Sequence, residues 1–81
     1  MIDYALAISD IEEIFGDSGG IFFSKKVGYY EVRVFMQNGE VQIKELLNGA
    51  VFKYCTVCTI EELKLNLSRI KNSLESRGWN Q

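Results

Sequence analysis

The sequence predicts an α+β fold: an N-terminal helix, an antiparallel β-meander of three to four strands and a C-terminal helix, with the helices packed on one face of the sheet. Two observations lead to this prediction. Two Asn-Gly pairs, Asn38-Gly39 and Asn48-Gly49, separate runs that alternate apolar and polar residues, and amphipathic segments stand before and after those runs. A chain of 81 residues has room for one two-layer core, so we expect a single domain over residues 1–81.

The first helix is expected over residues 3–15, with Asp3 capping its start and Gly16 ending it. At about 100° per residue, its apolar positions share an arc of roughly 120°. They are Tyr4, Ala7, Ile8, Ile11, Ile14 and Phe15. An alternative places a strand at residues 2–8 and begins a short helix at the capping-box pattern of residues 9–12. We prefer the long helix, because residues 4–8 do not alternate well.

A loop at residues 17–20 leads to a short strand at residues 21–24, which is expected to pair with the next strand. A four-residue turn at residues 25–28 then sets Phe23 opposite Tyr30, on the core face.

Residues 29–58 contain the meander. Asn-Gly is a strong hairpin signal, because both central residues of a type I′ turn have positive φ and Asn and Gly tolerate it best. Taking each pair as a two-residue loop sets Val34 opposite Ile43, and Ile43 opposite Tyr54. Side chains alternate between the faces with a period of two, so one face collects the core. Its members are Tyr30, Val32, Val34, Met36, Val41, Ile43, Leu47, Ala50, Phe52 and Tyr54, with Glu45 as the exception.

The opposite face of the meander is mixed in character. Arg33, Lys44 and Lys53 fall in one row across three adjacent strands, where like charges repel and some compensation is needed. Around this row the same register places Phe22, Tyr29, Glu31, Phe35, Gln42, Leu46, Val51, Cys55 and Val57.

The second helix opens at a capping box over residues 59–62 and is expected to end near Arg77. Its continuous apolar stripe consists of Ile60, Leu63, Leu67, Ile70 and Leu74. Leu6 and Leu65 lie off the stripes of their helices and are expected to be exposed. Trp79 either folds back over the edge of the core or anchors a partner, and we favour the fold-back.

Catalytic chemistry finds little support in the residue types. The chain has no histidine, which removes the commonest general base and most zinc sites. Cys55 and Cys58 match C-x-x-C, but a structural zinc site needs two further ligands. The two cysteines end a strand, whereas a redox pair stands at the start of a helix. We expect reduced structural cysteines, no metal, no cofactor and no enzymatic activity.

The charge distribution and the hydropathy of the chain limit its expected compartment and its expected partners. Residues 1–17 hold five acids and no base, while residues 18–81 hold six acids and nine bases. Such asymmetry is typical of a solvated helix face or of a surface for a basic partner. The start has no basic leader and no apolar run approaches the roughly 18 residues of a membrane span, so we expect a cytoplasmic protein without a membrane partner.

The mixed face is the candidate functional surface, because an apolar patch ringed with charge is typical of an interaction site. Three explanations stay open. The acidic first helix covers the face from within, a protein partner or second copy docks there, or single-stranded nucleic acid stacks on Tyr29 and Phe35 with the cations near its phosphates. Nucleic acid is less favoured, because the isoelectric point is about 5.0 and nucleic-acid-binding domains are usually basic.

In size, lack of catalytic residues, uneven charge and helix–sheet–helix layout, the chain resembles the small inhibitors that phages and plasmids make against host defence, anti-CRISPR proteins among them. This resemblance of format implies a stoichiometric blocker of a host protein or nucleoprotein complex. Such a blocker uses either the mixed face or the acidic helix, with Asp10, Glu12 and Glu13 standing in for phosphates.

We therefore expect a small non-enzymatic protein-binding module, an inhibitor or regulator, with a homodimer as a further possibility. The alternative is a single-stranded nucleic-acid-binding protein that uses the aromatic and basic sheet face. The expected partner-binding residues are Tyr29, Arg33, Phe35, Lys44, Lys53, Asp10, Glu12 and Glu13.

Overall fold

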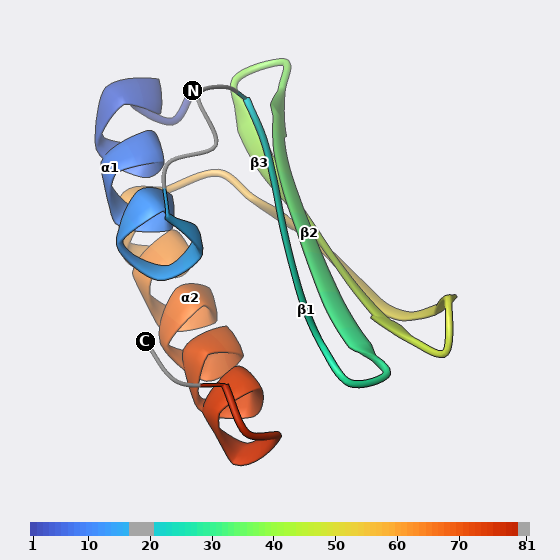
Figure 1. Ribbon diagram of the computed structural model, residues 1–81. Helices are drawn as coiled ribbons and strands as arrows, with labels where there is room; N and C mark the ends of the chain where they lie inside the picture. Colours follow the sequence, from blue (N-terminus) through green and yellow to red (C-terminus); the bar gives the residue numbers. More distant parts are fainter. Residues whose placement is uncertain (17–20, 80–81) are drawn as a thin grey trace.

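Two helices lie together on one face of a four-stranded antiparallel sheet, as the sequence predicts (Figure 1). The computed structural model describes residues 1–16 and 21–79, so the expected loop at residues 17–20 lies outside the described residues. The strands follow the order β1-β2-β3-β4, each paired with its neighbour in sequence. The elements are α1 (Tyr4–Phe15), β1 (Phe22–Val27), β2 (Tyr30–Gln37), β3 (Glu40–Leu47), β4 (Ala50–Val57) and α2 (Ile60–Ser76).

Helix α1 has the predicted cap and the predicted buried stripe. The Asp3 carboxylate accepts hydrogen bonds from the backbone N–H groups of Ala5 and Leu6, at 3.0 and 3.3 Å. Gly16, with φ of 79°, ends the helix. The stripe packs into the core through Ala7 and Ile11, with Tyr4, Ile8, Ile14 and Phe15 partly buried beside them. The alternative of a strand at residues 2–8 is therefore wrong.

Helix α2 packs against α1 and against the sheet, where it contacts β4. Thr59 Oγ1 accepts a hydrogen bond from the backbone N–H of Glu62 at 3.2 Å, which confirms the predicted cap. The stripe of Leu63, Leu67, Ile70 and Leu74 is buried, while Leu65 and, on α1, Leu6 are exposed as expected. Trp79 packs against the core, which confirms the fold-back.

Both Asn-Gly loops are present. Asn38 and Gly39 have φ of 55° and 77°, and Asn48 and Gly49 have φ of 53° and 80°. Positive φ at both central residues is the type I′ requirement on which the register argument depends. The β2–β3 ladder runs in the predicted register from Tyr30↔Leu47 to Gln37↔Glu40.

Strand β1 is longer than predicted and pairs in a different register. It continues to Val27, through residues that were expected to form the turn, and the turn lies at Gly28 and Tyr29. Phe23 consequently lies opposite Val34, not Tyr30. This shift covers an even number of residues, so Phe23 still faces the core, where it is fully buried. The tighter turn, with positive φ at Gly28, lets the strand form additional ladder pairs.

Strand β4 departs from the prediction through a β-bulge. The first two pairs of the β3–β4 ladder, Leu47↔Ala50 and Leu46↔Val51, keep the predicted register. The next residue, Glu45, lies opposite Lys53 instead of Phe52. Phe52 is thus the extra residue, and every later pairing moves by one position.

The bulge reverses the faces of the rest of β4. Tyr54 and Thr56 turn away from the helices, while Cys55 and Val57 turn toward them. The bulge puts the apolar side chain of Val57 in the core, where it is buried. A regular ladder would have placed the polar Thr56 under the helices and left Val57 exposed. The predicted core positions of Phe52 and Tyr54 are wrong, because both side chains are about half exposed.

Candidate partner-binding face

The face of the sheet that points away from both helices is the candidate site, and is called the open face below. Helix α1 contacts α2 and β1 on the other side, so it does not cover this face, and the explanation of a face covered from within is wrong (Figure 1). The cross-strand pairs place on the open face Phe22, Ser24, Lys26, Glu31, Arg33, Phe35, Gln42, Lys44, Leu46, Val51, Tyr54 and Thr56.

Two cations stand directly opposite each other at the centre of this face, Arg33 on β2 and Lys44 on β3. Their repulsion is compensated by separate partners. Arg33 donates from Nε to Glu31 Oε2 at 2.9 Å and from Nη2 to Glu31 Oε1 at 3.3 Å. Lys44 Nζ lies 5.6 Å from the ring centroid of Phe35 and 5.7 Å from that of Tyr54, within the range of cation–π attraction.

The hydrogen bond between Arg33 and Glu31 also shifts both side chains toward their charged forms. It lowers the pKa of Glu31 and raises the pKa of Arg33 from their ordinary values. The guanidinium plane is held in one orientation along β2, with further N–H groups available to another acceptor. Because solvent reaches both side chains, which are 44% exposed at Arg33 and 21% exposed at Glu31, the pair orders them more than it stabilises the fold.

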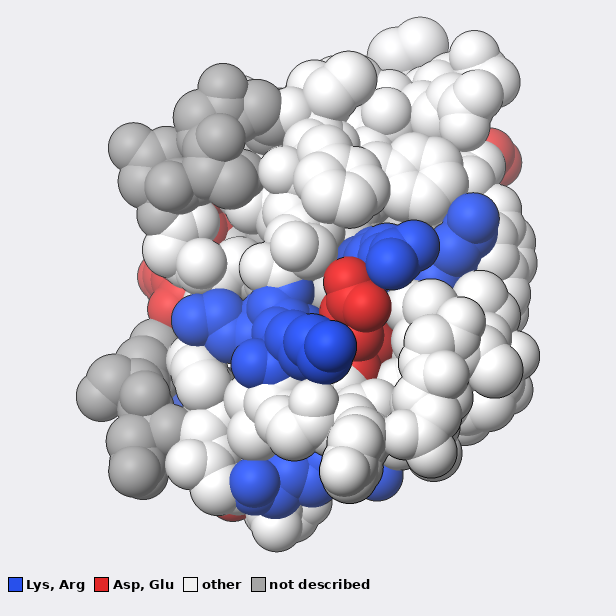
Figure 2. Space-filling model, turned by 45° about the vertical axis from the view of Figure 1, so that its right-hand side comes forward, with Lys and Arg blue, Asp and Glu red and all other residues white. Residues whose placement is uncertain are grey.

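Aromatic rings flank the two cations. Phe22 lies opposite Phe35 and is 53% exposed, and Tyr54 is 49% exposed with its hydroxyl donating to Gln42 Oε1 at 2.6 Å. An open apolar depression lies at the Phe22 end, lined by Ile21, Phe22, Phe35, Met36 and Gln37. Figure 2 shows Lys and Arg side chains across the middle of the molecule with acidic side chains among them, uncharged surface above and below this band, and further Lys and Arg side chains near the lower edge. Neighbouring strands thus hold apolar and cationic groups side by side.

Three of the predicted partner-binding residues come together on the open face: Arg33, Phe35 and Lys44. Tyr29 stands at the edge, in the β1–β2 turn, and is 76% exposed. Lys53 does not belong to the row. The bulge places it opposite Glu45 on the helix-facing side, and Tyr54 occupies the place beside Lys44 that was predicted for Lys53.

The three predicted acidic residues lie in the helical layer, on the other side of the sheet. Asp10 and Glu13 line a groove between α1 and α2 together with Lys64 and Lys71. Glu12 is half-buried on the same helix. The acids and the open face therefore cannot contact one flat partner surface together.

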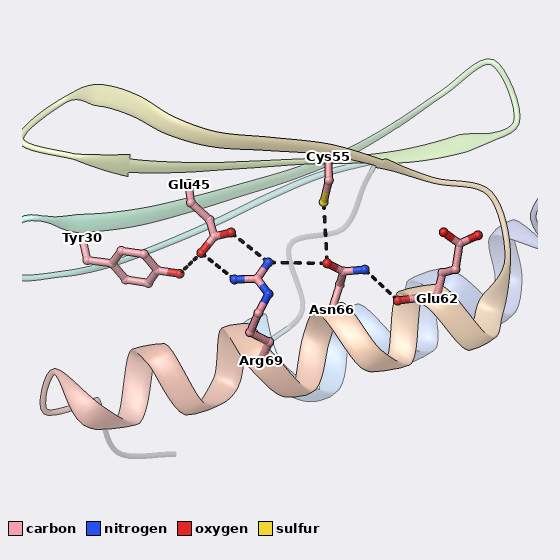
Figure 3. A network of polar contacts seen from close by, with 6 residues as sticks. All are labelled: Tyr30, Glu45, Cys55, Glu62, Asn66 and Arg69. Atoms are coloured by element: carbon pink, nitrogen blue, oxygen red, sulfur yellow. Dashed lines mark hydrogen bonds and ion pairs between the residues drawn. The ribbon is translucent and has the colours of Figure 1, made fainter.

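A buried polar network fastens α2 to the helix-facing side of the sheet (Figure 3). Glu45 is 2% exposed and accepts a hydrogen bond from the Tyr30 hydroxyl at 2.6 Å. Arg69 donates to both of its carboxylate oxygens, at 3.1 and 2.9 Å, and Arg69 also reaches Asn66 Oδ1 at 3.4 Å. The network holds the strand that carries Lys44 against α2. It was missed at the sequence level, although the lone charge of Glu45 on the core face was its signal.

Burial and hydrogen bonding act in opposite directions on the carboxyl group of this network. Burial alone would raise the pKa of Glu45, but the hydrogen bonds from Arg69 and Tyr30 and the Arg69 charge outweigh it, and the pKa is lowered. Burial and the hydrogen bond to Glu45 raise the pKa of Tyr30 well above its ordinary value. Glu45 is thus ionised and Tyr30 protonated at neutral pH, the forms in which each hydrogen bond has a donor and an acceptor.

The two cysteines are free thiols. Burial raises the pKa of Cys55, whose Sγ lies 3.7 Å from Asn66 Oδ1. A hydrogen bond to Glu40 raises the pKa of Cys58, so the start of α2 does not make it an activated thiol. Both shifts disfavour the thiolate that redox chemistry requires.

Comparison of the chain with protein-family models, with curated proteins and with solved structures finds no match. The site therefore has to be interpreted from its own residues. Within residues 1–16 and 21–79, no three side chains of the metal-ligating types come together. Neither α1 nor α2 is long and apolar enough to cross a membrane, and no other helix occurs in the described part of the chain.

Proposed function

We propose that this protein is a small non-enzymatic protein-binding module, an inhibitor or regulator that acts in the cytoplasm by stoichiometric contact with one partner protein. The partner docks on the open face. The observation that carries this proposal is the ordered arrangement of Phe22, Phe35 and Tyr54 around Lys44 and the Glu31-bound Arg33.

The residue types on the open face and the fixed positions of its two cationic side chains both favour a protein partner. Aromatic residues and Arg are enriched where interfaces hold most of their binding energy. The Arg33 and Lys44 side chains are already held by intramolecular contacts, so less conformational entropy is lost on binding. A partner with an apolar strip beside one or two carboxylates is complementary to this face, since the carboxylates can pair with the cations.

The edges of the sheet are poorer candidates for docking than its open face. Strand β1 carries Lys25 and Lys26, and β4 carries Lys53 beside the bulge at Phe52. Charged residues and bulges on edge strands discourage the addition of a further strand. Docking on the open face needs no free strand edge, because a partner there contacts exposed side chains.

The proposal extends to an inhibitor of a host protein or nucleoprotein complex, in the format of phage anti-CRISPR proteins. What supports this extension is the size and the division of charge between the helical layer and the open face. Asp10 and Glu13 belong to the helical layer, where they share a groove with Lys64 and Lys71.

Charge reversal of single lysines tests the docking face. Lys44→Glu changes the open face, and Lys64→Glu makes the same change of net charge in the helical layer, on the other side of the sheet. Each protein is immobilised and used to capture partners from a lysate of the cells that express it. A genuine partner is captured stoichiometrically by the wild type and by Lys64→Glu. The amount captured by Lys44→Glu should be at least tenfold lower.

Phe35→Ala is the apolar counterpart of this test. It removes a ring from the centre of the face and should reduce capture as strongly as Lys44→Glu, because central aromatic residues dominate interface energies. Far-UV circular dichroism on each variant establishes that it is folded. Equal capture by the Lys44 and Lys64 variants, or no stoichiometric partner at any salt concentration, would refute docking on the open face.

Single-stranded nucleic acid is the second candidate, and one observation favours it. Lys44 lies between the rings of Phe35 and Tyr54 on a four-stranded sheet, an arrangement able to stack two bases beside a phosphate. A fluorescent oligothymidylate at about 50 mM salt tests it, since electrostatic binding is strongest at low salt. Binding that Lys44→Glu abolishes and Lys64→Glu preserves would replace the protein partner by nucleic acid.

A further inference from the structure

A second surface lies at the end of the molecule that holds the β1–β2 turn, the β3–β4 turn and the C-terminal end of α2 (Figure 1). The two turns are joined by a hydrogen bond from the Asn48 backbone N–H to the Tyr29 carbonyl oxygen at 3.0 Å. Beyond α2, Trp79 packs near Lys25, whose Nζ lies 5.1 Å from its ring centroid. The guanidinium carbon of Arg77 lies 4.3 Å from the ring centroid of Tyr30.

Four cations belong to this end, which is called the basic end below: Lys25, Lys26, Lys53 and Arg77. None of them forms an ion pair with a carboxylate of the described residues, whose ion pairs engage Arg33 and Arg69. The nearest carboxylates along the sheet are already occupied. Glu31 lies opposite Lys26 but is bound to Arg33, and Glu45 lies opposite Lys53 but is bound to Arg69.

Apolar surface accompanies these charges. Phe52, Tyr29 and Leu47 are exposed large side chains, and the Phe52 ring lies 6.3 Å from that of Tyr30. Two of the cations rest on aromatic rings, which orders them while leaving N–H groups for an outside acceptor. The surface therefore combines ordered cations with exposed apolar side chains, so a complementary partner needs acidic groups next to an apolar one.

The opposite end of the molecule is acidic. At the opposite end, where α1 and α2 begin, lie Asp3, Glu40, Glu61 and Glu62, and the whole chain carries a net charge of −2. A long polyanion that extended from the basic end would soon meet acidic surface. A short acidic segment with an apolar residue fits the basic end without that penalty, because its charge is confined to the patch.

We propose that the basic end is a second interaction surface, which adjoins the open face at Lys26 and binds a short acidic protein segment that carries a large apolar side chain. The carboxylates of the segment pair with Lys25, Lys53 and Arg77, and its apolar residue packs beside Phe52. This surface would give a partner a second point of attachment and so raise its overall affinity.

A synthetic peptide of glutamates around two phenylalanines, labelled with fluorescein, is the probe. Its binding is followed by fluorescence anisotropy at about 50 mM salt, and again at about 200 mM, where electrostatic attraction is screened more strongly. Lys25→Glu/Arg77→Glu reverses two charges at the basic end. Arg33→Glu/Lys44→Glu reverses two charges on the open face and is the matched control, because both proteins have the same net charge.

The basic-end variant should weaken peptide binding at least tenfold, and the open-face variant less than threefold, since charge pairing acts over short distances at these salt concentrations. Equal weakening by both variants would show attraction to the net charge and overturn the proposal. No binding by the wild type would overturn it as well. Neither result depends on the partner of the open face, so the two proposals fail separately.

Two further measurements complete the test. If circular dichroism shows that the charge-reversed basic-end variant is unfolded, Lys25→Gln/Arg77→Gln replaces it, with at least a threefold loss expected. Light scattering of the wild type tests whether a second copy of the chain occupies the basic end. An oligothymidylate of similar charge, used in place of the peptide, tests whether nucleic acid does. Self-association through this end, or tighter binding of the oligothymidylate than of the peptide, would overturn the assignment to an acidic protein segment.

Discussion

Replacing Arg69 by methionine is the sharpest test of how the sheet is attached to α2. Glu45 is 2% exposed and accepts three hydrogen bonds, two from Arg69 and one from Tyr30. Arg69→Met keeps an unbranched side chain but removes both donors and the compensating charge. The Glu45 carboxylate then remains in the core with the Tyr30 hydroxyl as its hydrogen-bond donor.

The expected loss follows from the burial of the two partners. Breaking a buried ion pair by removing one member costs about 3–5 kcal/mol. The Arg69 side chain is 35% exposed, so water can reach the carboxylate in the variant, and we expect a loss of about 2–3 kcal/mol. A domain of this size has a total free energy of unfolding of roughly 4–12 kcal/mol. The melting temperature should fall by roughly 10–20 °C.

Urea denaturation followed by circular dichroism at neutral pH measures this loss. The double variant Glu45→Leu/Arg69→Met is the informative control, because replacing a buried ion pair by apolar residues is often neutral or stabilising. It should recover part of the stability that Arg69→Met loses, because the buried charge is gone while the Tyr30 hydroxyl has lost its acceptor. A loss below about 0.5 kcal/mol for the single variant, or a double variant less stable than the single one, would refute a buried, compensated Glu45.

Three further predictions concern pH dependence, capping and thiol reactivity. The folded pKa of Glu45 lies below its ordinary value of 4.5, so its contribution to the free energy of unfolding is present above that value and is lost as the pH falls through the folded pKa. Glu45→Gln should therefore flatten the decline of stability in urea titrations on the acidic side of 4.5, and an unchanged slope would contradict the lowered pKa. Asp3→Ala should lower the free energy of unfolding by about 1 kcal/mol in the same assay, because it removes the acceptor for the first N–H groups of α1, and no change would contradict the cap. Cys58 should react with iodoacetamide faster in Glu40→Gln than in the wild type at mildly alkaline pH, because the hydrogen bond to Glu40 raises its pKa, and mass spectrometry measures the rate. An equal rate would show that Glu40 does not govern that thiol.

Local chemistry was sufficient for the parts of the fold that the sequence predicts correctly. The two Asn-Gly loops depend on the tolerance of positive φ by those two residues, and the β2–β3 register follows from the first loop. The helix caps and apolar stripes likewise depend on residues a few positions apart. For the candidate site, this local information was enough to bring Arg33, Phe35 and Lys44 to one face.

Packing between distant segments decided the remainder. Whether β4 continues regularly or forms a bulge depends on which of its side chains lie under α2, and burying Val57 instead of Thr56 favours the bulge. That single extra residue moved Lys53 off the open face and Tyr54 onto it. No periodicity argument detects a bulge, because the alternation rule assumes an unbroken ladder.

The amino-acid sequence by itself determined the order of the elements, their caps, both tight turns and the pairing of β2 with β3. Only the tertiary structure decided which residue of β4 accompanies Arg33 and Lys44, and how the charge of Glu45 is neutralised. The reason is the range of the interactions, since turns and helices depend on neighbours in sequence. The bulge and the Glu45–Arg69 pair depend on a helix that follows the sheet in the chain and packs back against it.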